Sequence, residues 1–412
     1  MRRRQISRPL FTPALVLAAA AILLSASTSA RAQNGTQSGA QTGAQNGTET
    51  KAPASPPQSD ATSSPWIRPH APGDPLIWGR KDGIVFGLPS PGGLRGPRGL
   101  IRVGIISPTT GKPALLNYIA VEPVVLGPGS RGSRMAFSEL EPSRLDLDEH
   151  GAGEHGKRLW VDLSSYDKAN LPTGTLETFP AQREDPAIQR LSVQIDVERF
   201  SANGAHVHLI ASIDSDHPDE LRLSVYQEND SPAIEELALT ATMGNYARLR
   251  RLWLHRCVVD SREVMGSYTG DAFDDPPNYP LRDMLRTGDG DAIVFATTNE
   301  TTPSAGPAPG HWHYDLPRLT QYWRIAAHEI QPDLRVRVNG RRVYWASHNV
   351  VPGGIAYENF DVRQRYIPGQ TFIYGITGKS PWQFAPAVPG VEAPDAAAAQ
   401  DEGIHSSKGC AL

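Results

Sequence analysis

Strict alternation of apolar and polar residues is the feature that most constrains the fold of this chain. It runs through residues 191–198, returns in residues 207–213, and returns again in residues 221–225. A period of two residues is typical of a β-strand that buries one side and exposes the other to solvent. The three segments are short and follow one another closely, so they predict successive antiparallel strands.

Short segments of the same kind recur along the chain and predict an all-β fold. They are residues 84–88, 100–106, 118–126, 237–242, 250–259, 292–297, 322–330 and 371–376. Only residues 279–286, which follow two prolines, have the pattern of a helix. Many short strands favour a sandwich or barrel over alternating strands and helices. We expect an antiparallel β-sandwich with very little helix. An extended two-sheet sandwich is one form that this fold could take. This fold resembles the scaffolds of β-sandwich polysaccharide lyases and mutarotase-like proteins.

Two hairpins can be placed in register from their turns. In residues 334–345, Asn339-Gly340 separates two alternating runs, which is a strong hairpin signal. For residues 191–213, a three-residue loop with Gly204 in the left-handed conformation would pair Val197 with Leu209. The first hairpin would bury its apolar side and leave a basic side: Arg335, Arg337, Arg342 and Tyr344.

Composition divides the chain into four segments. Residues 1–32 combine a basic start, an apolar run and small residues up to Ala32, which is typical of a signal peptide cleaved after that residue. Residues 33–65 are rich in Gln, Gly, Thr and Pro and predict a disordered spacer. Residues 66–385 form the β domain, with room for two sub-domains, and residues 386–412 predict a disordered tail. The protein is therefore expected to be secreted or periplasmic and to have no membrane span.

Charge and cysteine content exclude several classes of protein. Removal of the signal peptide takes away five arginines and no acid, so the formal charge falls from −4 to −9. Nucleic-acid-binding domains are usually basic, so no nucleic-acid partner is expected. Cys257 and Cys410 are too few for a disulfide framework, and we do not expect them to pair. The chain also lacks the motifs of common esterases, zinc proteases and nucleotide enzymes.

Arginines and aromatic residues provide candidate substrate-binding groups. Like charges at adjacent strand positions repel each other, so a face with three arginines favours a bound anion. Guanidinium groups suit carboxylate or sulfate, and aromatic rings suit a sugar. The alternative is a solvated face that neighbouring acids neutralise. The candidates are Arg251, Trp312, Trp323, Arg335, Arg337, Arg342 and Tyr344.

Histidines, tyrosines and a pair of acids provide candidate catalytic groups. Residues 310–324 hold two histidines among aromatic residues, which suits a sugar site on a loop. Glu358 and Asp361 could be the two carboxylates of a glycosidase, or else ordinary acids of a surface loop. The candidates are His255, His311, His313, Tyr322, Tyr357, Glu358 and Asp361.

No cofactor and no catalytic metal are expected from the sequence. His311 and His313 lack the spacing of a zinc site. Asp271, Asp274 and Asp275 leave open a structural calcium ion, because carboxylate oxygens are its usual ligands.

Together these features favour an exported carbohydrate-active enzyme that cleaves an acidic polysaccharide or oligosaccharide. β-Elimination at a uronate needs a cation beside the carboxylate, a base and a proton donor, which the arginines, histidines and tyrosines could supply. A hydrolase would use Glu358 and Asp361 instead. The alternative is a non-catalytic carbohydrate-binding or structural envelope protein.

Overall fold

The computed structural model describes twelve stretches of the chain. They are residues 64–71, 73–88, 99–127, 134–135, 156–161, 173–180, 187–242, 249–266, 278–298, 319–343, 350–351 and 354–391. The chain divides into two units, Met1–Ser59 and Asp60–Leu412, and every described residue belongs to the second. None of the described helices is long and apolar enough to cross a membrane.

All 21 strands that the structure describes join one sheet, in which each strand pairs antiparallel with its neighbours. One run of strands is β1 (Trp66–Ile67), β2 (Ile77–Arg80), β3 (Ile84–Gly87), β4 (Ile101–Ile106), β5 (Pro113–Leu126), β12 (Ile234–Thr242), β20 (Ala356–Arg365), β19 (Arg335–Arg341) and β15 (Asn278–Pro280), with β6 (Arg134–Met135) on β5. The predicted all-β antiparallel fold is confirmed.

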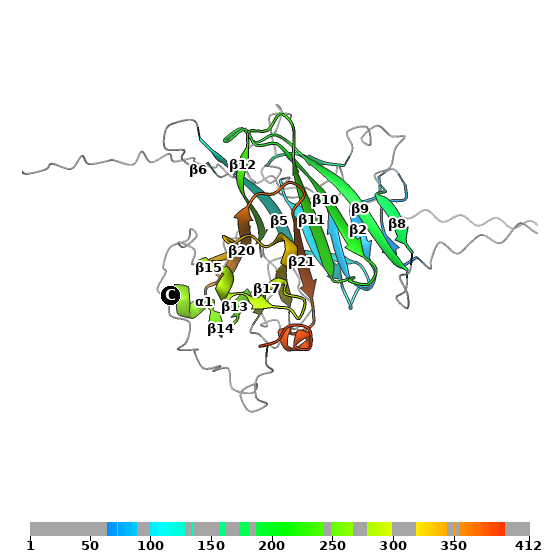
Figure 1. The fold of residues 1–412 in the computed structure, drawn as a ribbon. Helices are drawn as coiled ribbons and strands as arrows, with labels where there is room; N and C mark the ends of the chain where they lie inside the picture. Colours follow the sequence, from blue (N-terminus) through cyan, green and yellow to red (C-terminus); the bar gives the residue numbers. More distant parts are fainter. Residues whose placement is uncertain are drawn as a thin grey trace, which may run out of the picture. The chain divides into compact units, whose positions relative to one another are not determined.

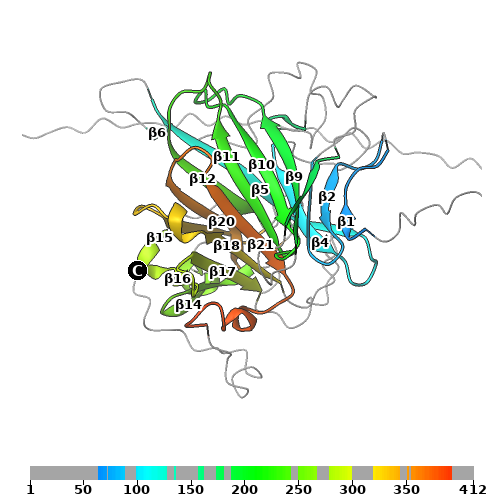
Figure 2. The same ribbon diagram turned by 45° about the vertical axis from the view of Figure 1, so that its right-hand side comes forward.

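The second run of strands completes the sheet. It consists of β8 (Thr175–Phe179), β9 (Ile188–Val197), β10 (Val207–Asp214), β11 (Glu220–Gln227), β21 (Thr371–Thr377), β18 (Thr320–Ile325), β17 (Ala292–Thr298), β13 (Leu249–Leu254) and β14 (Cys257–Asp260), with β7 (Leu159–Trp160) on β9 and β16 (Leu285–Arg286) on β17. Figures 1 and 2 show β9, β10, β11 and β21 as consecutive neighbours. The two runs meet where Leu249 of β13 pairs with Tyr357 of β20.

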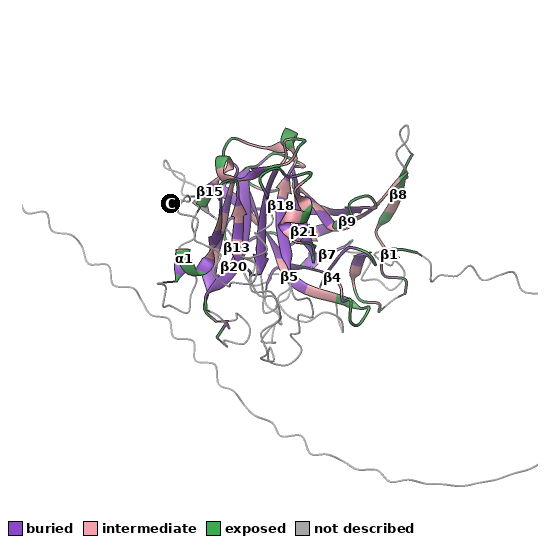
Figure 3. Ribbon diagram, turned by 90° about the horizontal axis from the view of Figure 1, so that it is seen from below, coloured by how far each residue is buried: buried purple, intermediate pink, exposed green. Residues whose placement is uncertain are grey.

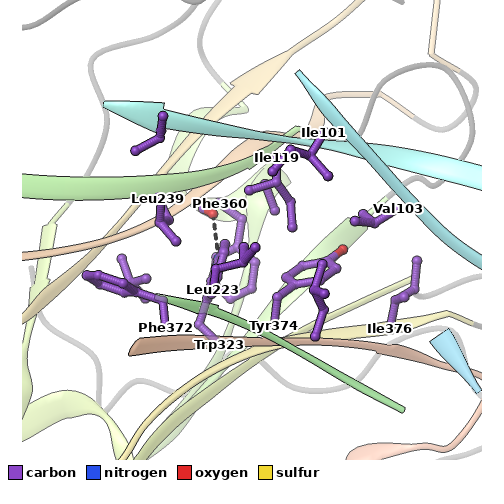
Figure 4. Close-up of a cluster of buried hydrophobic side chains, with 14 of the residues drawn as sticks. Ile101, Val103, Ile119, Leu223, Leu239, Trp323, Phe360, Phe372, Tyr374 and Ile376 are labelled. Carbon is purple, nitrogen blue, oxygen red and sulfur yellow. Dashed lines mark hydrogen bonds between the residues drawn. The ribbon is translucent and has the colours of Figure 1, made fainter. Parts of the chain in front are cut away.

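The core lies between the two runs, because the sheet curls so that they face each other. Alternate residues of each strand point into it, as the period of two requires. Trp323 donates a hydrogen bond across the core from Nε1 to the carbonyl oxygen of Phe360, at 2.9 Å (Figure 4). The side chains labelled in Figure 4 from the two runs are Ile101, Val103, Ile119, Leu239 and Phe360 on one side and Leu223, Trp323, Phe372, Tyr374 and Ile376 on the other.

Burial differs among the strands, and β21 and β17 are buried at every residue. β20 and β13 are buried along most of their length, whereas β8, at the outer edge of the second run, is mostly exposed (Figure 3). Helices are few and short among the described residues: α1 (Ser261–Met265) and the 3-10 turns η2 (Leu281–Asp283), η3 (Ala327–Glu329) and η4 (Pro381–Phe384).

The predicted hairpin at Asn339-Gly340 is wrong. β19 continues through both residues and pairs with β20 along its whole length and with β15 at its start. Gly340 serves close packing there, because a Cβ atom on it would lie 2.6 Å from Sδ of Met265 and 3.0 Å from the carbonyl oxygen of Ala356. Pairing with neighbouring strands therefore outweighs the turn preference of Asn-Gly.

The hairpin of β9 and β10 has the predicted faces but a different register. Leu209 pairs with Ile195 and not with Val197, which is a shift of two residues. Residues 198–206 form a longer connection than predicted, although Gly204 does adopt a positive φ of 74° within it. A shift of two residues leaves every side chain on its predicted face. Alternation thus predicts burial, while the length of the loop sets the register.

Three other segments differ from prediction. Residues 279–286, expected to be a helix, contain the end of β15, then η2 and β16. Residues 250–259, expected to be one strand, form the hairpin of β13 and β14, in which Leu254 pairs with Cys257. The segment that carries Glu358 and Asp361, treated as a loop, is β20, a central strand of the first run. Asp361 is therefore held by pairing on both sides, with Thr240 of β12 and Arg337 of β19.

A second apolar cluster covers the outer side of the second run. Phe384 of η4 contacts Tyr322 and Phe295, with ring centroids 5.5 and 5.3 Å apart. Val388 and Val391, within the predicted tail, are buried in the same cluster.

The cysteine expectation is wrong, because Cys257 of β14 is disulfide-bonded. The only other cysteine in the sequence, Cys410, lies outside the described residues.

Candidate functional site

The side of the first run that faces away from the core carries a band of charged and polar residues. Strand register places their side chains next to one another, since Arg335 pairs with Arg363 and Arg337 pairs with Asp361. We call this band the outer polar face. Its members are Glu122, Glu236, Thr240, Thr242, Arg335, Arg337, Asn339, Arg341, Asn359, Asp361 and Arg363.

Arg363 is at the centre of an ion-pair network on this face. Its Nη2 donates to Asp361 Oδ2 at 2.8 Å and to Glu122 Oε2 at 3.1 Å, and its Nη1 lies 3.7 Å from Glu236 Oε1. Glu236 also accepts a hydrogen bond from Arg335 at 2.6 Å. Burial lowers the pKa of Arg363, but Asp361 and the other carboxylates outweigh this effect and leave its pKa raised. Buried charges persist only when they are paired in this way.

Arg337 differs from Arg335 and Arg363, because it forms no hydrogen bond or ion pair with any residue that the structure describes. Its side chain is half-buried, and its Nε atom is fully buried. Burial lowers the pKa of Arg337, and the positive charge of Arg363 lowers it further, while Asp361 opposes the shift. A guanidinium in this position gains stability when an anion binds to it.

A β-bulge in β20 creates the position of Glu358. Asn339 pairs with Asn359, but the next residue of β19, Gly340, pairs with Tyr357. Glu358 is therefore an extra residue that has no partner in the ladder. Bulges are common beside functional sites, because they reorient a side chain that a regular strand would fix elsewhere.

The carboxyl group of Glu358 is buried without any hydrogen bond. The residue is 1% exposed, and neither carboxyl oxygen has a partner. Burial raises the pKa of Glu358 to about 8, although the charge of Arg341 opposes the shift. At neutral pH the group is therefore mostly protonated. A buried carboxyl held in its neutral form is a suitable proton donor.

Asp361 lies further along the same strand and has a different environment. Burial raises its pKa, but Arg363 and Arg337 oppose this and favour the carboxylate. β20 thus carries one acid without a hydrogen-bonding partner, Glu358, and one acid that is hydrogen-bonded to a cation.

Three of the predicted site residues lie in the interior and away from this face. The Tyr357 hydroxyl donates to the carbonyl oxygen of Val259 at 3.0 Å. The Tyr322 hydroxyl donates to Glu220 Oε1 at 3.2 Å, on the second run. Burial raises the pKa of both tyrosines well above its usual value. Trp323 is fully buried in the core.

The remaining predicted residues are also not gathered on the outer polar face. Arg251 lies on β13, and His255 is exposed in the turn after it. Arg342 is exposed just after the end of β19. Several predicted residues lie outside the described residues: His311, Trp312, His313, Tyr344 and the calcium candidates Asp271, Asp274 and Asp275.

Strand pairing places three predicted residues on the outer polar face: Arg335, Arg337 and Asp361. Glu358 lies at the bulge of the same strand, where the charge of Arg341 acts on its carboxyl group. The sequence does not identify Glu122, Glu236 and Arg363 as members of the site, because they come from strands that are distant in sequence. One signal could have found Arg363, since Asn359, Asp361, Arg363 and Arg365 alternate with apolar or amide residues.

Comparison of the chain with models of protein families, with curated proteins and with solved structures finds no match in any of the three. Within the described stretches, no three His, Cys, Asp or Glu side chains are grouped so that they could hold a metal ion.

Proposed function

We propose that the protein binds an acidic polysaccharide or oligosaccharide on the outer polar face and hydrolyses it. The observation that carries this proposal is the guanidinium of Arg337, which has no partner among the described residues. It can donate two parallel hydrogen bonds to a carboxylate or sulfate group. Asn339 and Asn359, partly exposed beside it, offer amide groups to sugar hydroxyls.

The two acids of β20 suit the chemistry of glycoside hydrolysis. Glu358, protonated at neutral pH, would donate its proton to the glycosidic oxygen as the bond from that oxygen to the anomeric carbon breaks. Asp361 would take a proton from the attacking water, or would itself attack the anomeric carbon before water releases the sugar. The water oxygen ends on the anomeric carbon in both routes.

β-Elimination has less support than hydrolysis. It needs a base that is unprotonated at neutral pH beside the substrate, but Glu358 is mostly protonated there, and none of the described residues of the outer polar face is a histidine. A non-catalytic carbohydrate-binding protein is the second candidate. This second candidate is favoured by the ion pairs of Arg335 and Arg363. These ion pairs already neutralise two of the cations that could contact a substrate.

The proposal includes export, as the signal peptide expected at residues 1–32 implies. N-terminal sequencing of protein recovered outside the cytoplasm should then begin at Gln33.

The direct test is incubation of the full chain with polygalacturonate, alginate, hyaluronan and chondroitin sulfate. Hydrolysis should release reducing ends without ultraviolet absorbance, and Glu358→Gln should abolish the release. Glu263→Gln, a change at an exposed glutamate of α1, is the matched control and should not affect it. Ultraviolet-absorbing products would show β-elimination, binding without cleavage would show the second candidate, and neither binding nor cleavage would contradict the proposal.

A further inference from the structure

The connection between β9 and β10 forms a pocket of about 530 Å³ that is separate from the residues of the outer polar face. Its walls include the aromatic rings of Trp160 and Phe200 and the polar side chains of Glu198, Arg199 and His206. The volume lies within the roughly 300–1,000 Å³ of small-molecule sites.

Hydrogen bonds hold this connection in one shape. Phe200 and Ala205 are joined by a backbone hydrogen bond of 2.9 Å, and the Gly204 amide donates to the Phe200 carbonyl at 2.9 Å. The Asn203 side chain donates to the carbonyl oxygen of Pro123 on β5, at 2.8 Å. The pocket is therefore formed before any ligand arrives, which reduces the entropy cost of binding.

The charged groups around the pocket neutralise one another. Lys157 Nζ lies 3.8 Å from Glu198 Oε1 and donates to the Ser201 hydroxyl at 3.1 Å. Arg199 lies 3.5 Å from Asp230 Oδ2. These pairs leave no excess charge to attract an anionic ligand, in contrast to the outer polar face.

His206 lines the pocket, and one of its ring nitrogens is engaged by a described side chain. Its Nδ1 lies 2.6 Å from Asp230 Oδ1, so this nitrogen carries the proton that the carboxylate accepts. In the neutral imidazole, Nε2 is then the acceptor. A hydroxyl group that enters the pocket can donate to it.

We propose that this pocket binds one ring of a neutral hexose oligosaccharide. Trp160 is half-buried and offers an apolar face of the size of a pyranose ring, and His206 Nε2 offers an acceptor to a ring hydroxyl. The pocket would bind a carbohydrate, as the outer polar face does in the proposed function. It would do so with different residues and with a preference for a neutral sugar over an acidic one. The pocket would hold a neutral unit of a mixed polymer, or a separate neutral chain.

The test is calorimetric titration of the full chain with cellohexaose, maltohexaose, mannohexaose and hexagalacturonate. At least one neutral hexasaccharide should bind, Trp160→Ala should raise its Kd by about tenfold or more, and Trp160→Phe should retain most of the affinity. His206→Ala should weaken binding severalfold. His208→Ala is the matched control and should not affect Kd, because His208 lies on β10, does not line the pocket, and its Nδ1 is 2.5 Å from Glu228 Oε1.

Several results would overturn the inference. They are no binding of any neutral hexasaccharide, unchanged binding in Trp160→Ala, or binding of hexagalacturonate that depends on Trp160. Arg337→Ala separates the two sites, because it should leave neutral-sugar binding unchanged. If no neutral sugar binds at the pocket but the uronate binds through Arg337, the pocket proposal fails and the proposed function stands. If a neutral sugar binds at the pocket but the uronate does not bind through Arg337, the proposed function fails and the pocket proposal stands.

Discussion

The buried carboxyl group of Glu358 links the pH dependence of folding to the outer polar face. Its pKa is raised to about 8 in the folded protein because burial disfavours the charged form, and no hydrogen bond offsets this. In the unfolded chain the group ionises near its ordinary pKa of about 4.3. The folded state therefore binds more protons between these values. Stability should fall as pH rises from about 5 to 8, and should change little from this group above that range.

Glu358→Gln should remove this part of the pH dependence. Between pH 5 and pH 8, the free energy of unfolding should fall by about 3 kcal/mol more in the wild type than in Glu358→Gln. Urea unfolding at the two pH values measures the difference. Glu263→Gln, at an exposed position, should behave like the wild type. Equal pH dependence in the wild type and Glu358→Gln would show that Glu358 is not held as a neutral acid.

At the scale of elements, the pairing of β19 with β20 positions the arginines, asparagines and acids that these two strands contribute to the site. Gly340 lies at the bulge, and a Cβ atom there would approach Met265 Sδ to 2.6 Å. Gly340→Ala should therefore destabilise the protein by about 1–3 kcal/mol, as overpacking does. Thermal unfolding checks this, with Gly378→Ala as the control, because nothing lies within 4 Å of a Cβ atom at that glycine. A stability change equal to that of the control would mean that the bulge tolerates a side chain.

The strands illustrate what sequence can predict and what it cannot. Alternation placed the side chains of β9 and β10 on their correct faces, because burial of every second residue is a local property. It could not give their register, which the longer connection sets. Asn339-Gly340 suggested a turn, but pairing of β19 with β20 decides the structure there. Pairing of this kind joins residues that the local sequence does not connect.

The candidate site was predictable in part for the same reason. Arg335, Arg337, Glu358 and Asp361 stand out in the sequence as charged groups within short segments. Their mutual positions could not be predicted, because the sequence indicates a surface loop where the structure has strand β20. The raised pKa of Glu358 also depends on a bulge that only the paired strands reveal.

At the scale of the whole molecule, the disulfide of Cys257 joins the β13–β14 hairpin to a distant part of the chain or to another molecule. The sequence contains one other cysteine, so we predict that Cys410 is the partner within the same chain. Peptide mapping without reduction should yield a linked pair of peptides in monomeric protein. Reduction should lower the free energy of unfolding by about 2–4 kcal/mol. A dimer joined through Cys257, or no loss of stability on reduction, would contradict this prediction.

We propose that the outer polar face recognises a negatively charged sugar through Arg337. The most direct measurement is the Kd of hexagalacturonate, or of the best acidic oligosaccharide found, for the wild type, Arg337→Ala and Arg342→Ala. Arg342 is the matched control, since it is an exposed arginine just beyond β19. Arg337→Ala should weaken binding by about tenfold or more, while Arg342→Ala should not. Equal affinity of the wild type and Arg337→Ala would contradict it.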